Sequence, residues 1–246
     1  MPLTTGKQTL ADTLTSIWLE GKNPHSVSEF AQKKSKAIYD FVHTGVPTTI
    51  ITTLPGGVVG GVTAGPVMGT GLGGFDKPVP GMGLPAAKSI LKSDLERIWT
   101  HNNAIREVSI IAKEYAQALF DYYSQAIILT LDTSAGPLPA PPPAGPVAGA
   151  TIGIGGVVAS VYGAGYDAVK GAMEAEFARI WLQVKSPLST SQLAGEMSEA
   201  IHAFCIAGKV DTIGTIVAPA AVATPPGPPI GSYFAGVGAS VSGIIS

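Results

Sequence analysis

The chain has 246 residues, a formal net charge of −2 and only 13% charged residues, about half the share that is usual in a soluble protein. No basic excess is present that would recruit nucleic acid through its phosphates. A single cysteine, Cys205, excludes an internal disulfide and a metal site built from several cysteines.

The chain repeats itself around its three tryptophans, which lie 81 and 82 residues apart. Alanines follow each tryptophan after 13 and 19 residues, and an aromatic residue follows after 23. The resulting set is Trp18, Trp99, Trp181, Ala31, Ala112, Ala194, Ala37, Ala118, Ala200, Phe41, Tyr122 and Phe204. We therefore expect three tandem repeats, 1–80, 81–165 and 166–246, which stack or assemble with one another.

The charges divide each repeat into two parts. Residues 49–75, 134–166 and 212–246 carry no charge, and they hold most of the glycine and proline. Each repeat is therefore expected to be a charged helical head followed by a neutral Gly/Pro-rich tail. This predicts a mainly α protein with extended or β arms.

The first helix of each head is expected to lead into its tryptophan, over 7–19, 86–100 and 168–184. In the second repeat Leu91, Leu95 and Ile98 fall at helical spacing, with charged residues on the opposite face.

The second helix begins at a local signal in two repeats. Ser26 and Ser189 each stand three residues before a Glu or Gln, which is the capping-box pattern. Gly45 and Gly208 follow at the positions of left-handed C-terminal caps. The second repeat lacks both signals, and its second helix is expected to start earlier and to run to about residue 129.

The two helices of each repeat are expected to pair as a hairpin around a tryptophan-anchored core. The hairpins cover about 7–45, 85–130 and 167–208. The recurrent alanines lie on the apolar face of the second helix, where small side chains let the partner helix come close.

The tails start with β-branched runs at 46–53, 127–133 and 210–217, which predict strands. Near-polyproline stretches at 139–143 and 225–229 should be extended. Because the tails lack large apolar side chains but also lack charge, we expect ordered arms laid over another surface, with strand addition to a partner sheet as one route. Free linkers, and a membrane-inserted segment at 151–166, are the alternatives.

Other motifs predict no catalytic, cofactor or metal site. The Gly-x-Gly-x-x-Gly match at 69–74 lies in a Gly/Pro tail rather than between a strand and a helix. The four histidines, His25, His43, His101 and His202, share no ligand spacing. Cys205 with His202 would be a nucleophilic pair without an orienting group. The lysines at 33, 34 and 36 are interpreted as a solvated face, with docking to an acidic neighbour as the alternative.

The junction of head and tail resembles small virion structural proteins of tailed bacteriophages with contractile tails. The matching residues are Ala37, Ile38, Phe41, Val42, Gly45, Val46, Thr48 and Thr49 in the first repeat, and Ala200, Ile201, Phe204, Cys205, Gly208, Val210, Thr212 and Thr215 in the third. The second repeat lacks the glycine. The resemblance implies a non-enzymatic part of a particle.

The sequence thus predicts a structural component of a large assembly, assembled in the host cytoplasm and located in a bacteriophage virion. We expect it to be oligomeric there and to contact other virion proteins through the arms 46–80, 131–165 and 209–246, without nucleic acid, membrane or cofactor. A membrane-active protein that inserts glycine-rich segments is the first alternative. A cysteine-dependent enzyme is the second.

Overall fold

The described residues are mainly helical, and their helices recur with the tryptophan spacing. The computed structural model describes residues 3–20, 26–45, 47–51, 57–58, 61–62, 68–75, 84–101, 107–126, 128–137, 146–160, 166–183, 189–216 and 237–245. The first helices of the repeats have 18 residues each: α1 (Leu3–Glu20), α3 (Leu84–His101) and α5 (Tyr166–Gln183). The second helices have 17 residues each: α2 (Val27–His43), α4 (Val108–Ser124) and α6 (Thr190–Ile206).

The observed bounds correct two expectations. The first helices begin two to four residues earlier than expected, because the inward-facing stripe already starts at Leu3 and Leu84, both fully buried. The second helix of the second repeat neither starts earlier than its equivalents nor reaches residue 129. It ends at Ser124, and Ile128 already belongs to a strand, as the β-branched residues there favour.

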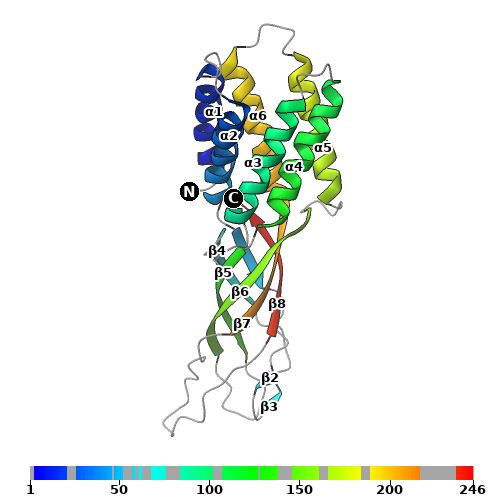
Figure 1. Ribbon diagram of the computed structural model, residues 1–246. Helices are drawn as coiled ribbons and strands as arrows, with labels where there is room; N and C mark the ends of the chain where they lie inside the picture. The colour runs from blue at the N-terminus through cyan, green and yellow to red at the C-terminus, as the bar shows by residue number, and fades with distance from the viewer. Residues whose placement is uncertain are drawn as a thin grey trace.

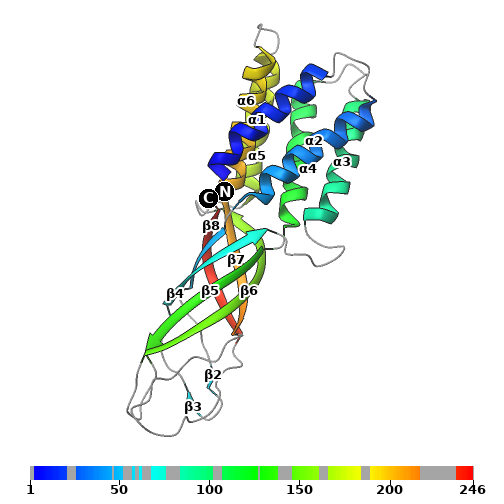
Figure 2. The same ribbon diagram turned by 90° about the vertical axis from the view of Figure 1, so that its left-hand side faces the viewer.

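The six helices form a closed ring, which we call the helical ring (Figures 1 and 2). Helices pair within each repeat, α1 with α2, α3 with α4 and α5 with α6. They also pack between repeats, α2 with α3, α4 with α5 and α6 with α1. We call these three contacts between repeats the seams. The hairpins therefore do not stand apart: each second helix contacts the first helix of the next repeat, and the last helix returns to the first.

One stripe of each first helix faces the ring interior. In α1 the buried positions are Leu3, Gly6, Leu10, Ala11, Leu14 and Ile17, and in α3 they are Leu84, Ala87, Leu91, Leu95 and Ile98. The spacing of three and four residues keeps these side chains on one helical face. In α5 the equivalent Met173, Phe177 and Ile180 are buried. The three helices thus contribute matching faces to one shared core.

The strands lie below the ring in Figure 1, so the molecule is elongated, with helices at one end and strands at the other. The strands are β1 (Pro47–Ile51), β2 (Gly57–Val58), β3 (Gly61–Val62), β4 (Met68–Phe75), β5 (Ile128–Pro137), β6 (Pro146–Ser160), β7 (Gly208–Ile216) and β8 (Val237–Ile245). β2 and β3 pair with each other, and the other six close into an antiparallel barrel in the order β1-β4-β5-β6-β7-β8.

The strand pairs repeat three times, as the helix pairs do. Each repeat supplies one pair, β1–β4, β5–β6 or β7–β8, with partners such as Ile50 and Thr70. Between repeats β4 pairs with β5, β6 with β7, and β8 with β1. Because each of the six strands pairs with a neighbour on both sides, the described part of the barrel has no edge strand to which a strand of another chain could add.

Several features of the tails can now be placed. Residues 151–160 belong to β6 and not to a helix, and the Gly-x-Gly-x-x-Gly match at 69–74 lies inside β4. Neither stretch has the local structure that a membrane helix or a phosphate-binding loop needs. The proline-rich stretches 139–143 and 225–229 lie outside the described residues.

Candidate functional site: the interior and seams of the helical ring

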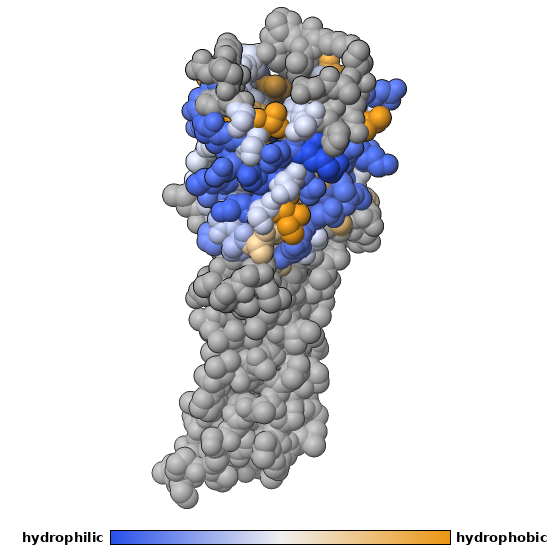
Figure 3. Space-filling model, in the orientation of Figure 1, coloured by the Kyte–Doolittle hydropathy of each residue, from blue (hydrophilic) through white to orange (hydrophobic). Residues whose placement is uncertain are grey.

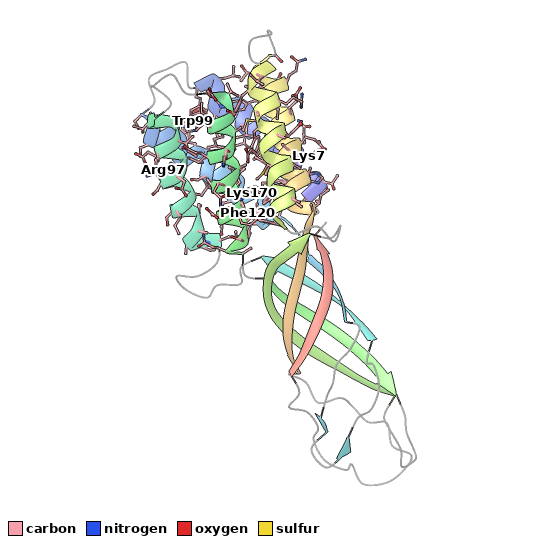
Figure 4. All side chains as sticks on the ribbon, turned by 90° about the vertical axis from the view of Figure 1, so that its right-hand side faces the viewer. Lys7, Arg97, Trp99, Phe120 and Lys170 are labelled. Carbon is pink, nitrogen blue, oxygen red and sulfur yellow. The ribbon has the colours of Figure 1, made fainter. Side chains whose placement is uncertain are left out.

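The tryptophans belong to an aromatic cluster inside the helical ring. Trp99 and Trp181 meet edge to face, with ring centroids 6.5 Å apart. Tyr115 packs edge to face on Phe177 at 4.9 Å and on Trp181 at 5.5 Å. Edge-to-face pairs of this kind are favoured by the quadrupoles of the rings. Trp18, Trp99 and Trp181 are partly buried against the core, and Figure 4 places Trp99 in the part of the ring farther from the barrel.

The residues of the repeat pattern lie in the same core. The six alanines at the two repeated positions are all buried, at 0–6% exposure, and so are the three aromatic residues: Ala31, Ala112, Ala194, Ala37, Ala118, Ala200, Phe41, Tyr122 and Phe204. Equivalent positions are therefore buried in all three repeats.

Lys34 is fully buried inside this aromatic cluster. Its Nζ lies 4.6 Å from the ring centroid of Tyr115, 5.1 Å from Trp99, 5.4 Å from Trp18 and 5.6 Å from Phe30. The side chain is 0% exposed, and within the described part of the chain Nζ has no hydrogen-bond partner. Burial lowers the pKa of Lys34 to about 7, whereas the faces of the rings stabilise its ammonium form.

The basic cluster at 33, 34 and 36 is thus not one solvated face, and this expectation was wrong for Lys34. Lys33 lies outside and pairs with Glu20 at 2.7 Å and Glu29 at 3.2 Å, and hydrogen bonds to these carboxylates raise its pKa. Lys36 is exposed and pairs with Asp40. Successive helical residues are turned by about 100°, so neighbouring lysines point in different directions.

A repeated lysine bridges each of the three seams. Lys7, Lys88 and Lys170 all stand eleven residues before a tryptophan. Lys7 of α1 forms an ion pair with Glu199 of α6. Lys88 of α3 lies over the ring of Tyr39 of α2 at 4.6 Å. These seam lysines were missed in the sequence, although their constant distance from the tryptophans is a signal.

The third seam has the same construction. Lys170 of α5 lies 5.0 Å from the ring centroid of Phe120 of α4 and donates a hydrogen bond of 2.8 Å to Gln117; Figure 4 labels Lys170 and Phe120 side by side. Each seam therefore joins a cation on a first helix to an aromatic ring, amide or carboxylate on the preceding second helix.

Ion pairs on the outer surface link the two helices inside each hairpin. Arg97 pairs with Glu114 at 3.6 Å, and at the equivalent place Arg179 pairs with Glu196 at 3.0 Å. In the first hairpin Lys33 and Glu20 supply the link. The face in Figure 3 is accordingly dominated by hydrophilic side chains over the helices, with hydrophobic residues in small separate spots.

The predicted N-caps lie at the starts of the second helices. The side chain of Ser26 accepts a hydrogen bond from the backbone N–H of Glu29. Ser189 accepts from the N–H of Gln192, whose side chain accepts from the N–H of Ser189, which closes a capping box. Glu107 stands at the equivalent place and makes no side-chain cap hydrogen bond.

The C-caps differ by one residue from the expectation. The cap residues are Thr44 and Ala207, both in the right-handed helical region. Gly45 follows Thr44 and donates its N–H to the carbonyl of Val42 at 3.0 Å. Gly208 follows Ala207 and begins β7. After the cap residue Ala207 the chain passes directly into β7, so Gly208 is the first residue of that strand.

The cysteine and histidine of the alternative nucleophilic pair lie in the core. Cys205 is 1% exposed, and burial raises the pKa of its thiol. This works against thiolate formation, which a nucleophilic cysteine needs. Burial, followed by the nearby charge of Lys7, lowers the pKa of His202. The hydroxyl of Tyr123 donates to the backbone carbonyl of Cys205 at 3.0 Å, which ties α4 to α6.

A groove of about 410 Å³ runs between α5 and α6. Apart from Glu176, its lining is apolar: Ala168, Val169, Ala172, Met173, Ala200, Ala203, Phe204, Ile206 and Ala207. The position of Ala203 is occupied by Asp40 and Asp121 in the other repeats. The groove between α3 and α4 is lined instead by charged residues that include Asp94, Lys113 and Asp121. The outer grooves of the second and third hairpins therefore differ in chemistry.

The described residues contain no cluster of three or more His, Cys, Asp or Glu side chains that could hold a metal ion. His43 stacks on Tyr39 at 5.5 Å within its own helix. His25 and the side chain of His101 lie outside the described residues.

Comparison of the chain with models of protein families, with curated proteins and with solved structures finds no match. Within the described part of the chain, no helix combines the length and the apolar character that crossing a membrane requires.

Proposed function

We propose that the protein is a non-enzymatic structural component of a large assembly, and that the assembly is a bacteriophage virion. The observation that carries the proposal is the threefold repetition of neighbour relations, in helices and strands alike, within one chain. A chain of this kind holds three hairpins in equivalent positions, each with an ion pair between its helices on the outer surface, although their grooves differ. One copy can therefore contact three equivalent subunits of a partner around a threefold axis.

The distribution of chemistry supports a docking role over catalysis. Charged side chains link the helices on the outside of the ring, while the interior, apart from Lys34, holds mainly aromatic and aliphatic residues. The cysteine lies in this interior, where its thiol stays protonated at neutral pH. The virion itself rests on the resemblance of the junctions around Gly45 and Gly208 to contractile-tail phage proteins.

The arms need a different mode of contact from strand addition. Because the six barrel strands pair within the chain, a partner would meet the sides or end of the barrel and the outer faces of the hairpins. Contact with other virion proteins through 46–80, 131–165 and 209–246 is therefore proposed to use side chains and loops.

Purified particles of the phage encoding the chain test this role. Quantitative mass spectrometry should find the chain in the particle at about one copy per three copies of a partner. In parallel, the isolated protein and the particle should be digested with thermolysin, because 49–75, 134–166 and 212–246 contain no lysine or arginine for trypsin. We expect cleavage in these segments to be slower in the particle. Absence from the particle, or equal cleavage in both states, would contradict the proposal.

A further inference from the structure

Lys34 is the only lysine, arginine, aspartate or glutamate among the buried side chains that the structure describes. Its neighbours come from four helices: Trp18 of α1, Phe30 of α2, Trp99 of α3 and Tyr115 of α4. These helices are the first and second repeats. Lys34 is therefore placed where the first repeat packs on the second.

We propose that Lys34 is a proton-operated switch of the helical ring: when its amine takes up a proton, the packing of the first repeat on the second weakens and the α2–α3 seam opens. The switch does not depend on the proposed role in an assembly. It rests on a buried amine, at a contact between two repeats, to which the described residues supply no counter-ion.

Among the described residues, no carboxylate contacts Nζ of Lys34. Of the four rings around Nζ, only the phenol of Tyr115 can ionise, and burial raises its pKa, so it stays neutral in both states of Lys34. Phe177 and Trp181, which pack on Tyr115 from α5, do not titrate. The hydroxyl of Tyr115 and Nε1 of Trp99 are also buried without a hydrogen-bond partner among the described residues. Within the described part of the chain, a new charge at Nζ therefore contacts only the faces of these rings.

The direction of the switch follows from the pKa of Lys34, which is about 7 in the closed ring and 10.5 in water. An open or unfolded state binds the proton more tightly than the closed ring, so falling pH favours opening between about 10.5 and about 7. Below about pH 7 Lys34 is protonated in both the closed and the open state, so a further fall in pH no longer shifts the equilibrium between them. The closed ring is therefore most stable relative to the open state at alkaline pH, and this stability falls as the pH approaches neutrality.

The other two repeats lack this group. Tyr115 and Met197 occupy the positions equivalent to Lys34, and both are buried. Neither gains a charge near neutral pH. The repeat pattern thus shows that the fold accepts an uncharged residue here, and it supplies methionine as the matched replacement.

Hydrogen–deuterium exchange of the full chain tests the switch. Wild type and Lys34→Met are compared from pH 6.5 to 9.5, with rates corrected for intrinsic exchange, and Lys113→Met, on the exposed side of α4, is the control. Relative to Lys34→Met, the protection of α2 and α3 amides in wild type should rise by up to about a hundredfold over this range. The protection of the α6 amides should not show this rise with pH. The Lys113→Met variant should show the same pH dependence as wild type.

A protection ratio that is independent of pH would overturn the switch, and so would an equal change in α5 and α6. If Lys34→Met does not fold, NMR titration of wild type with labelled lysine Cε carbons decides the matter. We expect one lysine to titrate near neutral pH and the others near the ordinary value. Titration of every lysine near the ordinary value would overturn the proposal.

Discussion

The seams of the helical ring are bridged by the same residue type in all three repeats, whereas its interior combines positions that repeat with one that does not. A lysine at the same position bridges each seam, as Lys7, Lys88 and Lys170 show. In the interior, one equivalent position holds Lys34, Tyr115 and Met197. The same contact between a second helix and the next first helix is formed three times, and each time it uses a lysine at the same position. The interior is shared, so different side chains from the three repeats must fill it together. Repetition therefore marks the lysines at the seams and the small residues at which helices pack closely, and divergence marks the one core position at which Lys34 lies.

The largest expected effect is in the interior. Phe177 is fully buried and packs on Tyr115 and Trp181. Phe177→Ala should lower the free energy of unfolding by about 3–5 kcal/mol, because it leaves a cavity among rings that cannot collapse. Denaturation in urea measures it. Leu182→Ala, at a side chain that is 57% exposed, is the control. Equal small losses for the two variants would show that the aromatic cluster is not the core.

The helix starts test whether repeats that differ in sequence are equivalent in structure. Ser189→Ala should cost about 1 kcal/mol of stability, because the N–H of Gln192 loses its acceptor. Glu107 has the same extended backbone, with φ −66° and ψ 137°, but no cap hydrogen bond. Glu107→Ser should therefore gain about 0.5–1 kcal/mol. Thermal denaturation of both variants gives the comparison, and a loss on Glu107→Ser would show that the second repeat starts its helix differently.

The seams should respond least to a single change. Lys170→Ala removes a part-buried hydrogen bond to the amide of Gln117 and a contact with the ring of Phe120. It should cost about 0.5–1 kcal/mol, since single hydrogen bonds and cation–π contacts of this kind are individually weak. Lys113→Ala on the exposed side of α4 is the matched control and should cost less. A loss above 3 kcal/mol for Lys170→Ala would place the main stabilisation in the seams and reverse the comparison.

The sequence predicted the parts of the molecule that depend on local pattern. The tryptophan spacing, the serine caps and the β-branched runs place the six helices and the starts of β1, β5 and β7 to within a few residues. The sequence did not predict that the six helices close into a ring. Packing of α6 on α1 joins residues as far apart as Lys7 and Glu199, and no local sequence pattern indicates such a contact.

The buried position of Lys34 was missed for a different reason. Its neighbours Lys33 and Lys36 suggested a charged face, and the run of lysines was given more weight than the helical spacing of the buried residues. Yet Lys34 stands three residues after Ala31 and three before Ala37, both on the buried face. The helical period therefore contained the signal, and the aligned Tyr115 and Met197 repeat it.

The closed ring is tested most directly by a zero-length cross-link between Lys7 and Glu199, the ion pair that joins the first helix to the last. The monomer is treated with a carbodiimide and digested, and the cross-linked peptides are identified by mass spectrometry. A mixture of ¹⁴N- and ¹⁵N-labelled protein separates links within one chain from links between chains. Closure predicts a Lys7–Glu199 link within single chains, beside the Lys33–Glu20 link inside the first hairpin. Formation of the Lys33–Glu20 link without the Lys7–Glu199 link, or a Lys7–Glu199 link only between chains, would contradict it.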